Sequence, residues 1–142
     1  MRVLLVEDSE YIRNQFVRLF ADVPFVSVVG HAVSEDEAVD AIGTLSPDVV
    51  LVDLNLQTGS GMHVLRRARQ AGFAGKLFVL SGRDPDFYQS LCERHGADGF
   101  YDKAHEQAKL LDDLRALSEA SRTSGVAGTS TAPDASDTSA LR

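Results

Sequence analysis

The sequence lacks the features of disulfide-bonded, membrane-spanning and nucleic-acid-binding proteins. Its single cysteine, Cys92, cannot form an intrachain disulfide. Its uninterrupted apolar runs, such as VLLV and VVLV, are only four or five residues long, whereas a membrane-spanning helix needs roughly 20, and no basic-then-apolar leader precedes them. Lys and Arg number 14 against 21 Asp and Glu, and this net charge of -7 disfavours binding to a nucleic-acid backbone. We therefore expect a cytoplasmic protein that neither enters a membrane nor binds nucleic acid directly.

The remaining composition is typical of one globular domain followed by a polar tail. With 44% hydrophobic and 25% charged residues, the 142-residue chain can bury a core. The last stretch, SRTSGVAGTSTAPDASDTSALR, consists mostly of Ser, Thr, Gly and Ala and contains no aromatic residue. Such a segment buries too little apolar surface to offset the entropy of ordering it. We expect a folded domain over residues 1–118 and a disordered tail over residues 119–142.

Hydrophobic periodicity predicts an alternation of strands and helices. Five β-like runs, RVLLV (2–6), FVSVVGHAV (25–33), DVVLV (48–52), KLFVLS (76–81) and DGFY (98–101), are separated by amphipathic stretches. Ser9, Ser34 and Ser60 stand where the first three helices need N-caps, and Ser34 with Glu37 fits a capping box. The first, third and fourth runs are apolar without alternation, which indicates burial on both faces. The pattern predicts an α/β, doubly wound, five-stranded parallel sheet with five helices.

Polar side chains stand at the carboxyl ends of four of these runs. Glu7 and Asp8 follow the first run, Asp53 the third and Ser81 ends the fourth, while Lys103 lies just after the fifth. The second run ends without a comparable group, as expected of an edge strand in the order 2-1-3-4-5. In an open parallel sheet, ligands bind outside the carboxyl ends of the strands where the strand order reverses. We therefore expect these side chains to converge on one crevice.

The chemistry of this crevice favours a hard cation and an anionic ligand. Three neighbouring acids repel one another unless a cation lies among them. Oxygen ligands suit Mg2+, whereas the four histidines are scattered over different elements and do not indicate a zinc site. Lys103 and Ser81 could hold two oxygens of an incoming anion. A phosphoryl group is the anion that this set best fits.

Residues 1 to about 118 resemble the receiver domain of two-component response regulators, which has a flavodoxin-like fold. The family pattern is an acidic pair after the first strand, a phosphoacceptor Asp after the third, a Gly eight residues on, a Ser or Thr after the fourth strand, and an aromatic residue three before a Lys. This sequence has each in order: Glu7 and Asp8, Asp53, Gly61, Ser81, Phe100 and Lys103. Any one of these residues is weak support, but the whole set is specific.

The resemblance implies a role for each acid. Asp53 would accept a phosphoryl group from a phosphohistidine on a sensor histidine kinase or on a histidine phosphotransfer protein. Mg2+ would be held by Asp8, Asp53 and the carbonyl of Asn55, with Glu7 acting through water. Lys103 would pair with the phosphoryl group. The protein would assist its own phosphorylation and dephosphorylation without being a turnover enzyme.

The resemblance also implies a conformational switch. Ser81 would accept the phosphoryl group by a hydrogen bond and move inward, which would let Phe100 turn toward the sheet. The surface of the fourth helix, fifth strand and fifth helix would change as a result. Because no output domain follows residue 118 in this sequence, we expect the signal to leave through protein contacts.

Two positions depart from the family pattern. Gln57, four residues after Asp53, and Ala104, after Lys103, stand where the family usually has proline. Neither change removes a chemical group from the set above. The loops that carry these residues are the places where a difference from the common form is expected.

Three alternative functions compete with a phosphorylated switch. A phosphatase of the haloacid dehalogenase type would need a second Asp at position 55, which is Asn here, and a flavodoxin-like cofactor carrier would need an uncharged loop where this chain has EDSE. The third is a degenerate receiver that acts as a constitutive interaction module. The complete set of acids, together with Ser81 and Lys103, disfavours this third function. Phosphorylation by acetyl phosphate, tested with and without Mg2+, would distinguish a degenerate receiver from a working switch.

Overall fold

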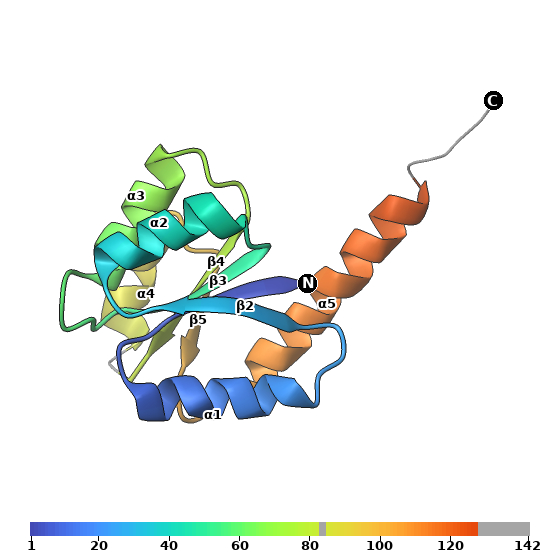
Figure 1. Ribbon diagram of the computed structural model, residues 1–142, viewed down its shortest axis with the longest axis horizontal. Helices are drawn as coiled ribbons and strands as arrows, with labels where there is room; N and C mark the ends of the chain where they lie inside the picture. Colours follow the sequence, from blue (N-terminus) through green and yellow to red (C-terminus); the bar gives the residue numbers. More distant parts are fainter. Residues whose placement is uncertain (83–84, 128–142) are drawn as a thin grey trace. The chain divides into compact units, whose positions relative to one another are not determined.

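The computed structural model describes residues 1–82 and 85–127, in which strands and helices alternate along the chain (Figure 1). The elements are β1 (Arg2–Val6), α1 (Glu10–Ala21), β2 (Ser27–Ala32), α2 (Glu35–Leu45), β3 (Val49–Asp53), α3 (Gly61–Gln70), β4 (Lys76–Ser81), α4 (Pro85–Arg94), β5 (Gly99–Asp102) and α5 (Gln107–Ala127). All five predicted strands are present. β2 is shorter than the predicted run, and β3 extends one residue further, to include Asp53.

The five strands form one parallel sheet in the order β2-β1-β3-β4-β5. This confirms the predicted doubly wound α/β fold with β2 at an edge. β1 and β3 are neighbours, with Val6 opposite Val52, so the residues that follow β1 lie beside the end of β3. The strand order reverses at this point, because the chain places β2 on one side of β1 and β3 to β5 on the other.

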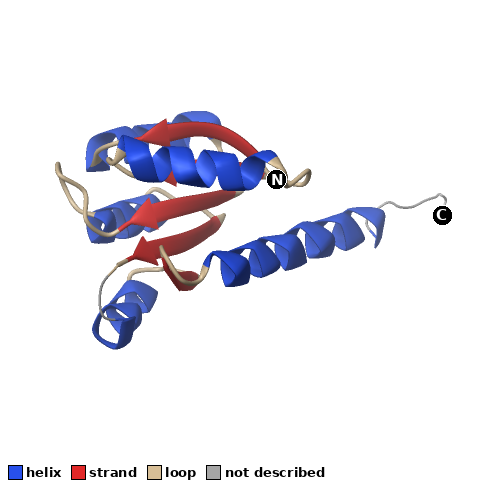
Figure 2. Ribbon diagram, turned by 90° about the horizontal axis from the view of Figure 1, so that it is seen from below, coloured by secondary structure: helices blue, strands red, loops and turns tan. Residues whose placement is uncertain are grey.

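Helices cover both faces of the sheet (Figures 1 and 2). On one face α2, α3 and α4 pack over alternate strand residues, which are Leu4, Val6, Val50, Val52, Leu77, Val79 and Phe100. On the other face lies α1, which buries Phe16 and Phe20. The central strands are therefore buried on both sides, as their unbroken apolar runs predicted.

Serine side chains cap the N-termini of the first three helices, as predicted. Ser9 Oγ accepts from the backbone N–H of Ile12 at 3.2 Å, and Ser60 Oγ accepts from that of Met62 at 3.1 Å. Ser34 caps α2 in the same way, but the return bond of the box differs from the expected form: Glu37 accepts from the N–H of Val33, not of Ser34. The caps at Ser9 and Ser60 fix the helices that follow the two acid-bearing strand ends.

The sheet and the first four helices belong to one compact unit, Met1–Gln107, and a second unit begins at Ala108. Its described part is the helix α5, which continues to Ala127. Residues 119–127, predicted to be disordered, are therefore helical here, and residues 128–142 lie outside the described residues. The predicted domain boundary at residue 118 stays a prediction.

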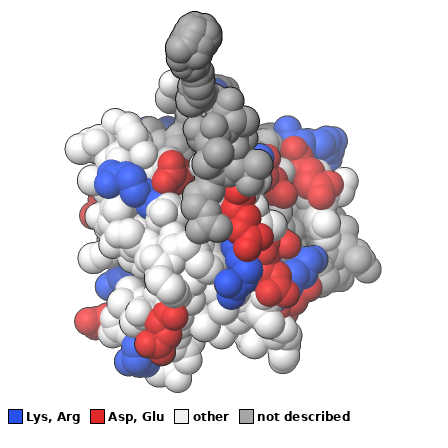
Figure 3. Space-filling model, turned by 90° about the vertical axis from the view of Figure 1, so that its right-hand side faces the viewer, with Lys and Arg blue, Asp and Glu red and all other residues white. Residues whose placement is uncertain are grey.

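The described residues contain no helix that could cross a membrane, and the face drawn in Figure 3 carries no continuous basic surface. Within residues 1–82 and 85–127, each helix is too short or too polar to cross a bilayer. On the face drawn in Figure 3, acidic and basic side chains lie interspersed. A basic stripe of the kind that tracks a phosphate backbone is not present on that face.

Candidate functional site

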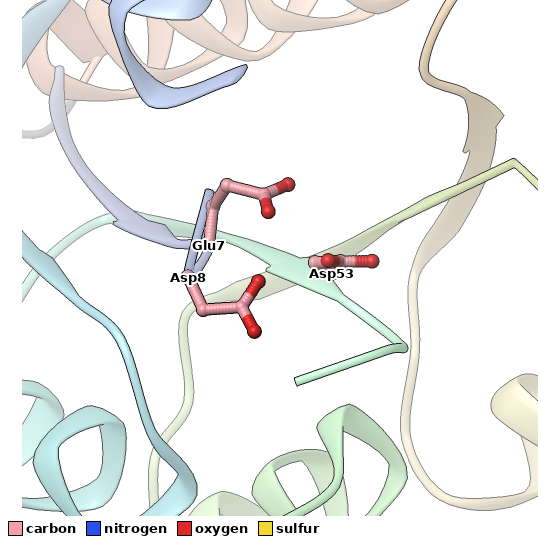
Figure 4. A group of neighbouring side chains, drawn as sticks. All are labelled: Glu7, Asp8 and Asp53. Atoms are coloured by element: carbon pink, nitrogen blue, oxygen red, sulfur yellow. The ribbon is translucent and has the colours of Figure 1, made fainter. Parts of the chain in front are cut away.

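Three carboxyl groups meet at the point where the strand order reverses. Glu7 and Asp8 directly follow β1, and Asp53 is the last residue of β3. One oxygen from each can be chosen so that all three lie within 4.8 Å of one another. Figure 4 shows their side chains directed into the same space between the ends of the two strands. The structure thus brings together the three acids that the sequence placed at one crevice.

The acids differ in their exposure to solvent. Glu7 is 3% exposed and Asp53 is 2% exposed, whereas Asp8 is half-buried. Buried carboxylates are costly unless they are paired or hydrogen-bonded. The two deepest acids therefore need nearby donors.

Lys103 supplies a shared cation. Its ammonium lies 3.1 Å from Glu7 Oε1 and 3.2 Å from Asp53 Oδ2. Burial disfavours the charged form of Lys103, but the charges of Asp53 and Glu7 outweigh that effect and raise the pKa of its ammonium. Lys103 is therefore charged at neutral pH and bridges the two buried acids.

One ammonium does not neutralise three acids. Burial and the neighbouring charge of Asp53 raise the pKa of Glu7 to about 7, although the N–H of Ser9 and the ammonium of Lys103 favour its carboxylate form. A carboxyl group whose pKa lies this close to neutral pH indicates that the site holds too little positive charge to stabilise all of its carboxylates.

The donor set fits a divalent cation with a preference for oxygen. Three carboxylates from two strand ends can each offer one oxygen, and the ligand group contains neither Cys nor His. Mg2+ is bound by few carboxylates and keeps several waters, which suits a partly open site. The residues therefore fit the ion that the sequence predicted.

Asp53 is held by both of its oxygens. Oδ1 accepts from the backbone N–H of Asn55 at 3.1 Å, while Oδ2 pairs with Lys103. The carboxylate orientation is therefore fixed before any ligand binds. Gly61 allows the chain to return close to this residue, because a Cβ at position 61 would overlap the backbone carbonyl of Asp53.

Ser81 and Lys103 lie at neighbouring strand ends. Ser81 is 1% exposed at the end of β4, next to the strand that carries Asp53. Its backbone carbonyl accepts from the N–H of Lys103 at 3.1 Å, which ties the lysine loop to β4. Ser81 is thus positioned at the rim predicted from the sequence.

The predicted switch residue Phe100 is already buried in this structure. Its side chain is 8% exposed and belongs to the core that includes Val79 and Cys92. The ring therefore lies inside, under α4. A movement of Phe100 that follows phosphorylation stays a prediction.

Several contacts at the site have no counterpart in the predicted set. The N–H of Gln57 donates to Asp8 Oδ2 at 2.6 Å, the N–H of Ser9 donates to Glu7 Oε2 at 3.1 Å, and Arg13 donates to the carbonyl of Glu7 at 2.9 Å. Two of these donors are backbone groups, which residue identity does not reveal. The only signal in the sequence was the absence of proline at position 57.

The second departure from the family pattern also supplies a backbone donor. The N–H of Ala104 donates to Asp102 Oδ1 at 2.8 Å, and the N–H of His105 donates to the same oxygen at 2.9 Å. A proline at position 104 could not make the first bond. Asp102 therefore closes the loop that begins with Lys103.

The fold and the site define a class of protein: a parallel α/β domain with a lysine-bridged acidic cluster where the strand order reverses. Residues 3–115 match the family model of the response regulator receiver domain. The nitrate/nitrite response regulator protein NarL of Escherichia coli (strain K12) is 30% identical over 114 residues, covering 79% of this chain and 52% of NarL. The response regulator GacA of Pseudomonas viridiflava is 28% identical over 115 residues, covering 81% of this chain and 54% of GacA.

Solved structures show the same fold. A LuxR-family two-component response regulator from Aurantimonas sp. SI85-9A1 has a TM-score of 0.77 at 26% identity, covering 84% of this chain and 85% of that one. The BeF3-activated receiver domain of Klebsiella pneumoniae RstA has a TM-score of 0.75 at 26% identity, covering 83% of this chain and 98% of that one.

This chain belongs to the response regulator receiver domain family. Receiver domains of two-component systems are phosphoacceptors, generally not turnover enzymes, that bind Mg2+ at an acidic pocket and interact with histidine kinases and phosphotransfer proteins. The chain has such an acidic cluster. It spans about half the length of the curated relatives it matches.

Proposed function

We propose that Asp53 accepts a phosphoryl group from a phosphohistidine on a sensor kinase or a phosphotransfer protein. An oxygen of Asp53 forms the new bond to phosphorus, the bond from phosphorus to the imidazole nitrogen breaks, and that nitrogen keeps the electron pair and takes up a proton. The observation that supports this role most directly is the shared ion pair of Lys103 with Asp53 and Glu7.

Lys103 is the group that changes partner. Attack converts the Asp53 carboxylate into a neutral acyl group that carries a charged phosphoryl group, so the negative charge moves outward. The ammonium is bound to Asp53 Oδ2 before the reaction and can follow that charge to a phosphoryl oxygen. Glu7, the second partner of Lys103, keeps the ammonium beside Asp53 during this exchange.

The remaining site residues hold the reactants. Asn55 orients Asp53 through its N–H, and we assign its carbonyl, with Asp8, Asp53 and Glu7, to the Mg2+ site. A bound Mg2+ would neutralise the acids and the charge on the transferred group. The donor set and the raised pKa of Glu7 support this assignment.

We further propose that Ser81 binds a phosphoryl oxygen through its hydroxyl and that this contact changes the surface of α4 and β5. Ser81 ends β4, whose neighbour β5 carries Phe100 at its core face. A shift at Ser81 is therefore transmitted to a packed aromatic ring, and packed cores change between discrete arrangements more readily than they deform gradually.

Replacement of the acceptor tests the proposal. Asp53→Asn should fold normally and take up no label from acetyl phosphate or from a phosphorylated kinase in the presence of Mg2+. Asp40→Asn, which changes an exposed acid on α2, is the matched control and should be labelled like the wild type. Full labelling of Asp53→Asn would move the site elsewhere. A wild type that takes up no label with Mg2+ would favour a constitutive interaction module.

A further inference from the structure

The residue at position 57 contacts the acidic cluster, Glu7, Asp8 and Asp53, through its backbone. The N–H of Gln57, in the β3–α3 loop (residues 54–60), donates to Asp8 Oδ2 at an N···O distance of 2.6 Å. Asp8 belongs to the group of three acids, and the side chain of Gln57 is exposed. The contact therefore joins the two segments that carry the site, the turn after β1 and the loop after β3, and depends on the main chain alone.

We propose that the backbone N–H of Gln57 positions the Asp8 carboxylate for the divalent cation. This inference rests on the Mg2+ site proposed above. A half-buried carboxylate on a turn can rotate, and a ligand must give up that freedom when it binds an ion. Because one oxygen of Asp8 is held by the N–H, rotation is restricted while the other oxygen stays available. A donor of this kind acts as the outer partner that orients a metal ligand.

The donor is itself held in place by contacts with α2. The carbonyl of Thr58 accepts from the N–H of Glu35 at 3.1 Å, and Glu35 Oε1 accepts from the N–H of Ser60 at 3.1 Å. Gly59 lies so close to Glu35 that a Cβ there would overlap its side chain. The loop is therefore fixed immediately after Gln57. An N–H group on a fixed loop can restrict the position of the carboxylate that it binds. An N–H group on a mobile loop would instead move together with the carboxylate.

The residue at position 57 matters for this contact through its backbone N–H and not through its side chain. Any residue with a backbone N–H can make this bond, and proline cannot. Gln57→Pro therefore removes the donor, while Gln57→Ala removes the side chain and keeps the donor.

The test compares Mg2+ binding to four proteins by NMR titration of the full chain: wild type, Gln57→Ala, Gln57→Pro and Asp8→Asn. Gln57→Ala should bind Mg2+ like the wild type, and Gln57→Pro should bind roughly tenfold more weakly, as is typical when an outer partner of a ligand is lost. Equal affinities of Gln57→Pro and Gln57→Ala would overturn the inference but leave the proposed function intact. A wild type that does not bind Mg2+, or an Asp8→Asn variant that binds as tightly, would overturn both.

A second measurement does not depend on the proline variant folding. In the metal-free wild type, the amide hydrogen of Gln57 should be protected from exchange with solvent and should resonate downfield, since it donates to a carboxylate. In Asp8→Ala it should lose both properties, while the Ser60 amide, which donates to Glu35, should keep its protection. A Gln57 amide that exchanges freely in the wild type would show that the bond is absent.

Discussion

Glu7 is the site residue whose protonation depends most clearly on the fold. The same carboxyl group that pairs with Lys103 lies beside Asp53 and is almost fully buried, and the effects that favour its neutral form win. Its pKa of about 7 means that small pH changes near neutrality alter the charge of the acidic cluster. The protonation state of the metal-free site therefore varies over the range in which the protein would work.

This shift predicts a pH dependence of stability. The pKa of Glu7 is raised from 4.5 to about 7 on folding, so the folded state binds more protons than the unfolded state between these values. The stability that Glu7 contributes is fully present below pH 4.5 and is lost as pH rises through about 7. In EDTA, the free energy of unfolding should fall between pH 5 and pH 8 by roughly 1–3 kcal/mol more in the wild type than in Glu7→Gln.

Denaturant melts at several pH values measure the effect. Glu10→Gln is the control, because Glu10 is an exposed glutamate in the first turn of α1 and is close to Glu7 in the sequence. The free energy of unfolding of Glu10→Gln should depend on pH in the same way as that of the wild type. If Glu7→Gln keeps the full slope, Glu7 does not carry the extra proton in the folded state.

At the scale of elements, the β3–α3 loop decides the geometry of the site. It follows Asp53, the last residue of β3, and Gly61 starts α3 directly against the end of that strand, with its N–H donating to the carbonyl of Leu54 at 3.2 Å. A side chain at position 61 has no room, because a Cβ would overlap the carbonyl of Asp53. The helix can therefore start this close to the strand only with glycine at this position.

Two glycine-to-alanine changes should have opposite effects. Gly61→Ala should lower the free energy of unfolding by about 1–3 kcal/mol, because the loop must shift to admit the methyl group. Gly43→Ala, in α2, has open space around the new Cβ and should raise it by up to about 1 kcal/mol, since alanine is the better helix former. Thermal or denaturant melts of both variants decide this, and a Gly61→Ala protein as stable as the wild type would contradict the close approach.

The sequence predicted the elements and the strand-end residues but not the contacts between loops. Strand burial and helix caps follow from side-chain type, so the sheet order and the meeting of Glu7, Asp8 and Asp53 could be predicted. The bond from Gln57 to Asp8 is made by a main-chain N–H, which every residue except proline has, and it joins segments far apart in the chain. The extension of α5 to Ala127 was missed because Ser, Thr and Gly are weak helix formers and composition alone argued for disorder.

For the whole molecule, the acidic cluster couples stability to metal binding. Removing a charge from Asp8 relieves repulsion in the metal-free protein, and Asp8→Asn retains an oxygen that can still accept from Gln57. In EDTA this variant should therefore be more stable than the wild type, by up to about 1 kcal/mol. The charge that the proposed function needs at Asp8 would then lower the stability of the metal-free protein.

Mg2+ should reverse this ranking. A ligand that binds only the folded state stabilises it by mass action, by about 1.4 kcal/mol at ten times its dissociation constant. The wild type should gain this stability, whereas Asp8→Asn has lost a charged ligand and should gain much less. Denaturant melts of both proteins, each in EDTA and in millimolar Mg2+, measure the four free energies. Equal stabilisation of the two proteins by Mg2+ would show that Asp8 is not a ligand. A variant less stable than the wild type in EDTA would show that the three carboxylates do not repel one another.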